Sequence, residues 1–167
     1  LCIFLAYGTT AGVARQLGAG QRRAALAQGV DGLWLAVAIG VPVTVATALL
    51  AGPLVALFGA SPDVADHATT YLRITAGGTT PLLLVLATTG VLRGLQDTRT
   101  PLAVAVVGNL ANLALNVVLV YGVGPAPRLE LAGSAWGSVA AQLGMAVALV
   151  TVVVRAARAE GAPLSPD

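Results

Sequence analysis

The chain has 167 residues, of which 57% are hydrophobic and only 10% are charged, and its mean hydropathy is +0.87. Soluble domains are about 45–50% apolar and about 25% charged, so this composition all but excludes a water-soluble enzyme, a nucleic-acid binder or a disordered chain. The nine basic residues, all arginines, stand between apolar segments, and we interpret them as the orientation signals of a membrane protein.

Five apolar segments separated by short connections predict membrane-spanning helices. The first, about 1–14, is short and lacks an initial Met, so we expect it to be the remainder of a helix and the chain to be a fragment. A spanning helix needs about 20 mainly apolar residues, and four segments supply them: about 33–57, 74–92, 101–121 and 131–154. None shows the alternation of a barrel strand. The sequence therefore predicts an all-α, polytopic membrane helix bundle.

The connections between these segments carry local signals. Ser61-Pro62-Asp63 is typical of an N-cap and first turn, and it predicts a short helix leading into the next span. Asp31 is interpreted as a first-turn carboxylate that the helix dipole stabilises. Residues 157–167 form a polar tail, and its Gly- and Pro-rich part, residues 161–167, is expected to be frayed.

The arginines are distributed unequally between the two sides that these spans define. Seven fall on the side of the first connection: Arg15, Arg22, Arg23, Arg93, Arg99, Arg155 and Arg158. Two, Arg73 and Arg128, fall on the opposite side. Cytoplasmic connections carry the excess of basic residues, so the Arg-rich side is predicted to be cytoplasmic. We expect a multi-pass protein of the bacterial plasma membrane.

Glycine pairs at helical spacing predict close contacts between helices. The pairs are Gly8 with Gly12, Gly90 with Gly94, and Gly133 with Gly137. Small residues four apart let helix backbones approach each other. Their number favours a bundle in which each helix has several neighbours.

The most informative polar pattern is a run of three asparagines in the fourth long segment. Asn109, Asn112 and Asn116 fall within an arc of about 60° on a helix otherwise made of Ala, Leu and Val. Two interpretations are open: interhelical hydrogen bonds that hold the bundle together, or a polar stripe lining a cavity that binds a substrate or coupling ion. Three further polar residues at membrane depth join this candidate cavity: Thr89, Ser138 and Gln142.

The sequence offers no candidate for enzymatic chemistry. It contains no Ser/His/Asp or Cys/His arrangement and no metal-ligand spacing. We therefore expect neither an enzyme nor a bound metal or cofactor, and no nucleic-acid partner.

Several stretches resemble the multidrug and toxic compound extrusion (MATE) family of secondary transporters, and most closely its DinF-like branch. They are the Ala-Arg-Gln-Leu-Gly-Ala-Gly run at 14–20, Arg-Gly-Leu-Gln-Asp-Thr-Arg-Thr-Pro at 93–101, and Asn112-x-x-x-Asn116 continuing to Tyr121-Gly122. The Gly-Ser-Ala-Trp-Gly run at 133–137 also fits the start of the family's sixth helix. The order is that of the family, and the resemblance covers about residues 1–156.

This resemblance implies helices two to six of the family's amino-terminal six-helix lobe, with the first helix and the second lobe missing. It implies efflux of cationic or amphipathic small molecules in exchange for H⁺ or Na⁺. Many relatives carry a carboxylate where this chain has Asn116, and an amide cannot take up a proton near neutral pH. Asn112 and Asn116 are therefore carried over as polar cavity residues only, and the coupling ion stays open.

Two other functions remain possible at this point. A flippase for lipid-linked precursors could share the fold, because fold does not determine function, although the arginines at helix ends favour drug export over binding of lipid phosphates. A non-transporting membrane scaffold is the other alternative, and an inward-facing Asn stripe argues against it. The expected partners are a small-molecule substrate, the lipid bilayer and the missing parts of the full-length chain.

Overall fold

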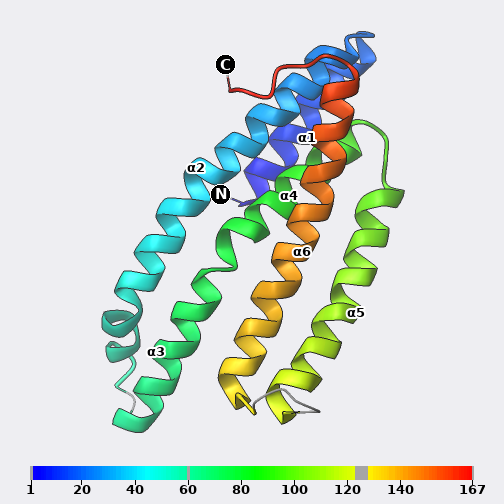
Figure 1. Cartoon of the computed structure of the whole chain (residues 1–167). Helices are drawn as coiled ribbons and strands as arrows, with labels where there is room; N and C mark the ends of the chain where they lie inside the picture. Colours follow the sequence, from blue (N-terminus) through cyan, green and yellow to red (C-terminus); the bar gives the residue numbers. More distant parts are fainter. Residues whose placement is uncertain (1, 60, 123–127, 167) are drawn as a thin grey trace.

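The structure, a computed structural model, describes residues 2–59, 61–122 and 128–166, with side chains from residue 8 onward. All regular secondary structure in these residues is helical (Figure 1). The helices are α1 (Cys2–Gly18), α2 (Arg22–Ala56), α3 (Pro62–Ala76), α4 (Thr79–Gly94), α5 (Arg99–Tyr121) and α6 (Glu130–Ala159). The predicted all-α membrane helix bundle is confirmed.

Four helical stretches of the described chain are long and apolar enough to cross a membrane. They are Arg22–Ala56, Pro62–Gly94, Arg99–Tyr121 and Glu130–Ala159. The remaining helix, α1, has 17 residues, fewer than the roughly 20 that a span needs, and it covers the segment predicted to be the remainder of a helix. The other four predicted segments fall on the four long stretches.

The third predicted span consists of two helices rather than one. α3 begins at Pro62 after Ser61, as the sequence indicated, and it ends at Ala76. Gly77 and Gly78 then form a tight turn, in which their N–H groups donate to the carbonyls of Ile74 and Thr75 at 3.0 and 2.9 Å. Glycine favours a helix interior poorly, so the interruption falls at this pair.

α4 and α6 form the centre of the bundle. α4 packs against α1, α2 and α6, whereas α6 packs against α3, α4 and α5. α5 lies at the edge and is supported almost entirely by α6 (Figure 1). The main hydrophobic core joins α1, α4 and α6 through side chains such as Val13, Val91, Leu149 and Val153, all nearly or fully buried.

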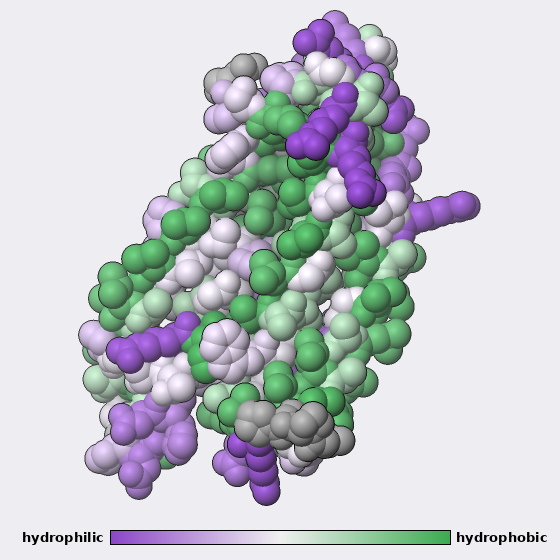
Figure 2. All heavy atoms as spheres, in the orientation of Figure 1, coloured by the Kyte–Doolittle hydropathy of each residue, from purple (hydrophilic) through white to green (hydrophobic). Residues whose placement is uncertain are grey.

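The Arg-rich connections meet at one end of the bundle. Gly12 of α1 packs against Gln28 of α2, and Gly94 of α4 packs against Val13 of α1, so the C-termini of α1 and α4 lie beside the N-terminus of α2. In Figure 2 hydrophilic side chains gather at the two ends, with a mainly hydrophobic band between them. This arrangement is the one that the predicted spans and orientation require.

The C-terminal tail is ordered, and the prediction that it is frayed is wrong. Beyond α6 the chain folds back over α2, where Ala162 is buried and the indole N–H of Trp34 donates to the carbonyl of Leu164 at 2.9 Å. Arg22 Nε and Glu160 Oε1 form an ion pair at 2.9 Å beside it. The composition of the tail suggests flexibility, but contacts with a helix more than a hundred residues earlier hold it in place.

Asp97 caps the N-terminus of α5. Its Oδ1 accepts hydrogen bonds from the backbone N–H groups of Arg99 and Thr100 at 3.1 and 3.0 Å. The pKa of the Asp97 carboxyl is held below its usual range, first by the hydrogen bond from the Thr100 side chain and then by the backbone N–H groups. Asp97 thus stabilises the start of α5. The Gln-Asp-Thr-Arg sequence at 96–99 therefore has a structural role.

Replacing Asp97 by Ala should lower the free energy of unfolding by about 1 kcal/mol, the usual cost of losing such a cap. Asp97→Asn should cost less, because its amide oxygen still accepts. Because the folded-state pKa is lowered, the carboxylate stabilises fully above the unfolded pKa of about 3.9, and the stabilisation is lost as pH falls through the folded value. Thermal melting of the full-length protein at neutral and acid pH checks this, and an equal cost at both pH values would contradict it.

Glycines form the closest contacts between α5 and α6. A Cβ atom on Gly133 would lie 2.5 Å from the carbonyl oxygen of Leu119, and one on Gly137 would lie 2.6 Å from Oδ1 of Asn116. On α1, by contrast, Gly12 packs against Gln28 while Gly8 has no atom within 4 Å of its Cβ position. Five of the six paired glycines that the sequence singled out lie in helix contacts: Gly12, Gly90, Gly94, Gly133 and Gly137.

Gly133→Leu should therefore separate α5 from α6 and lower the free energy of unfolding by about 3 kcal/mol. Gly144→Leu on the same helix is the matched control, because its Cβ position is open, and it should change stability by less than about 0.5 kcal/mol. Thermal unfolding of the full-length protein in detergent measures both. Equal melting temperatures for the two variants would show that the close contact is not needed.

Candidate functional site

Two of the three predicted asparagines form a hydrogen-bonded pair on α5. The Nδ2 of Asn116 donates to Oδ1 of Asn112, one helical turn earlier, at 3.0 Å. Both side chains are half-buried. The pair leaves Asn116 Oδ1 as an acceptor that is not used within α5.

That acceptor is directed at α6. Asn116 Oδ1 is buried, lies against Gly137, and accepts no hydrogen bond from any described residue. An unpaired amide oxygen in apolar surroundings is costly, about 1–3 kcal/mol by mutational measures. The position therefore favours a donor group or a cation from outside the described chain.

The third asparagine lies apart from this pair. Asn109 is exposed, and its Nδ2 donates to the carbonyl of Ala105 on its own helix at 2.8 Å. Its amide is thus partly satisfied locally. The structure brings Asn112 and Asn116 together and leaves Asn109 at the margin of the stripe.

The polar candidates outside α5 lie on α4 and α6. Ser138, Gln142 and Thr89 are all half-buried, and Oε1 of Gln142 lies against Gly78 at the break between α3 and α4. Across the described chain, the Asn112–Asn116 bond is the only hydrogen bond that joins two of the six candidates. The six residues therefore lie around a common region rather than forming one network.

The position of this region follows from the helix contacts. α5 meets α6 along Gly108, Leu119 and their neighbours, and at about 100° per residue Asn112 and Asn116 lie on one side of that contact line. On α6, Ser138 lies between the side facing α5 and the side facing α4. The asparagine pair and Ser138 thus face the sector between α4 and α5.

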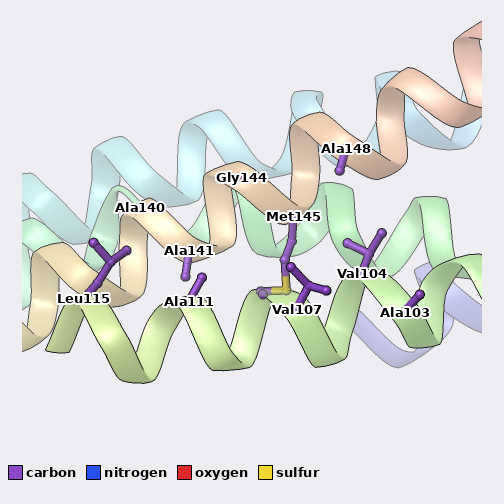
Figure 3. Close-up of a pocket in the computed structure, with 11 residues that line it drawn as sticks. Ala103, Val104, Val107, Ala111, Leu115, Ala140, Ala141, Gly144, Met145 and Ala148 are labelled. Atoms are coloured by element: carbon purple, nitrogen blue, oxygen red, sulfur yellow. The ribbon is translucent and has the colours of Figure 1, made fainter. Parts of the chain in front are cut away.

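The opposite side of the α5–α6 contact is apolar. A groove of about 400 Å³ runs there between the two helices and is lined by residues such as Ala103, Ala111, Ala140 and Gly144. Met145 points from α6 toward α5, between Ala111 and Val107 (Figure 3). None of the six candidate residues lines this groove. The α5–α6 pair therefore has one polar and one apolar side.

Sequence reasoning missed one buried polar group and misplaced another residue. Oε1 of Gln28 is buried without a hydrogen-bond partner in the described chain, at the contact with Gly12. The sequence signal that could have identified Gln28 is a single Gln within an Ala-rich run, opposite a helix with small residues such as Gly12. Asp31 is not a first-turn carboxylate, because α2 begins at Arg22 and Asp31 is its tenth residue. The helix starts earlier because the Ala-rich run before Asp31 favours helix.

No group of His, Cys, Asp or Glu in the described parts of the chain is placed to hold a metal ion. The chemistry that this arrangement supports is binding through amide and hydroxyl groups. Such groups accept from and donate to a polar ligand or coordinate a cation weakly through oxygen.

Comparison with known proteins identifies the family. The sequence model of the MatE family matches residues 1–118, more than half of the chain. The chain belongs to the MatE family. The resemblance found in the sequence motifs is confirmed.

Relatives of this family cover most of the chain. A probable multidrug resistance protein NorM of Deinococcus radiodurans is 35% identical over 159 residues, which are 95% of this chain and 32% of the relative. Its counterpart in Thermotoga maritima is 29% identical over 77% of this chain and 28% of its own length. A FAD transporter of Shewanella oneidensis is 28% identical over 81% of this chain and 30% of its own length.

Solved structures of the MatE family share the fold. A MATE crystal structure in complex with MaD5 has a TM-score of 0.83 at 24% identity, covering 93% of this chain and 35% of that one. An inward-facing multidrug resistance MATE family transporter of the MOP superfamily has a TM-score of 0.81 at 22% identity. The match covers 90% of this chain and 33% of that one. This chain therefore spans about a third of the length of each of these relatives and solved structures.

Proposed function

We propose that this chain is part of a secondary-active efflux transporter that exports cationic or amphipathic small molecules in exchange for H⁺ or Na⁺. Membership of the MatE family and the names of its NorM relatives support export. The observation that carries the proposal is the Asn112–Asn116 pair, with its unpaired, buried Oδ1, on an otherwise apolar α5. We propose that the pair contacts substrate or coupling ion, with Asn109, Thr89, Ser138 and Gln142 around it.

The polarity of the pair supports this substrate class. An amide oxygen without a donor favours an ammonium or another hydrogen-bond donor, as cationic drugs carry. A lipid-linked phosphate would need cations nearby, and the single arginine of α5, Arg99, is its first residue, 13 positions before Asn112. We place the site in the plasma membrane, with the Arg-rich end in the cytoplasm.

Replacing either asparagine of the pair by Leu should reduce export by about fivefold or more, because each removes a polar contact of at least about 1 kcal/mol. Val117→Leu is the matched control, since Val117 is on the same helix and points outward. Drug export by proteoliposomes of the full-length protein, at equal reconstitution, measures the effect. If both Leu variants export like the parent, the pair only holds the helices together.

Asn116→Asp tests the coupling ion. It introduces the carboxylate that the family resemblance places at this position, and such a group can release and bind a proton or pair with Na⁺. Export by the variant should depend more strongly on the external pH or sodium concentration than export by the parent. Unchanged dependence on both would remove this position from ion coupling without affecting its role in substrate binding.

A further inference from the structure

A second, separate groove lies between α2 and α6 near the Arg-rich end of the bundle. It encloses about 250 Å³ and is almost entirely apolar. Val30 and Val37 of α2 form one wall, Val150 and Val154 of α6 form the other, and Leu84 of α4 lies at its floor. The groove thus lies at the depth of lipid acyl chains, just inside one membrane surface.

The C-terminal tail borders this groove at its Arg-rich end. Leu164 lines the groove, and its carbonyl accepts the indole hydrogen bond from Trp34, which also lines it. Tryptophan is enriched where hydrocarbon meets headgroups. A helix is about 10–12 Å across, so a groove of about 250 Å³ is too small for one, whereas an acyl chain fits.

Two arginines that form no ion pair within the described residues flank the end of the groove beside Leu164. Arg158 lies one turn beyond Val154 on the same face of α6, and Arg23 lies two turns before Val30 on the same face of α2. Both are exposed, and neither forms an ion pair within the described residues. Arg22 differs, because Glu160 neutralises it. Positive charge therefore stands next to an apolar groove at the surface of one leaflet.

We propose that this groove and the two arginines bind one anionic phospholipid of the cytoplasmic leaflet. One acyl chain occupies the groove between α2 and α6, and the phosphate lies between Arg158 and Arg23. The cytoplasmic leaflet carries the anionic lipids, and basic residues beside hydrophobic helices select their headgroups. The proposal concerns a surface distinct from the Asn112–Asn116 pair.

The test measures lipid retention by the full-length protein, independently of transport. Native mass spectrometry compares phosphatidylglycerol with phosphatidylcholine of the same acyl chains. The parent should retain one phosphatidylglycerol in preference to phosphatidylcholine. The double variant Arg23→Gln/Arg158→Gln should lose the preference by about tenfold, whereas Arg128→Gln, at the other end of the bundle, should keep it.

A second variant tests the groove itself. Val150→Trp should fill the groove and abolish the retained lipid, whereas Leu113→Trp, on the exposed face of α5, should not. Size-exclusion chromatography shows which variants remain folded. If Val150→Trp does not fold, the lipid preference of the Arg23→Gln/Arg158→Gln variant alone tests the proposal. Equal retention of both lipids by the parent, or full retention by the double variant, overturns the proposal. Because no drug transport enters the readout, its failure is separate from failure of the proposed function.

Discussion

At Gly133 the backbone of α6 lies so close to that of α5 that even a methyl group would meet the carbonyl of Leu119. Lipid provides no hydrophobic force between helices, so their association depends on van der Waals contact and therefore on how closely the backbones approach. α5 has almost no other neighbour in the described chain. The position of every polar group on α5, including the Asn112–Asn116 pair, therefore depends on this glycine contact.

The same contact explains why the two sides of α5 differ. One side of the contact line carries the amide pair, and the other carries small apolar residues such as Ala103 and Ala111. A polar side that faces lipid would leave its amides unsatisfied, and in the described chain the amide pair lies on the side of the contact toward α4, away from the apolar groove. The polarity of α5 thus fixes its rotation about its own axis, while the glycines fix its distance from α6.

Local and compositional features of the fold could be predicted from the sequence, and long-range ones could not. Apolar length and arginine placement predicted the helices and their common Arg-rich end, because both follow from properties that each segment has alone. The start of α3 at Pro62 was likewise visible in a local motif. The order of the tail was not, because it depends on Trp34 of a distant helix. The break at Gly77 was missed because the uncharged segment 74–92, predicted as one span, runs across it.

For the candidate site, the shared arc of the asparagines was predictable from helical periodicity, but their partners were not. Asn109 turns back to its own helix at Ala105, whereas Asn116 turns toward Asn112. The hydrogen-bond partner of each amide depends on the packing of the neighbouring helix, which the spacing of the asparagines does not specify. The position of Asp31 within α2 was missed for a related reason, since the start of a helix in an Ala-rich segment has no sharp local signal.

The tail also has a mechanical consequence. α2 and α6 touch each other only sparsely along their length, yet the chain beyond α6 is fastened to Trp34 and Arg22 at one end of the pair. At the Arg-rich end the tail joins the two helices, and at the opposite end α3 packs between them. Sliding or separation of α2 and α6 at the Arg-rich end would break the contacts of the tail, whereas a small change of the angle between them would not. The tail therefore adds a direct link between α2 and α6 at the Arg-rich end, beyond the packing of both helices on α4.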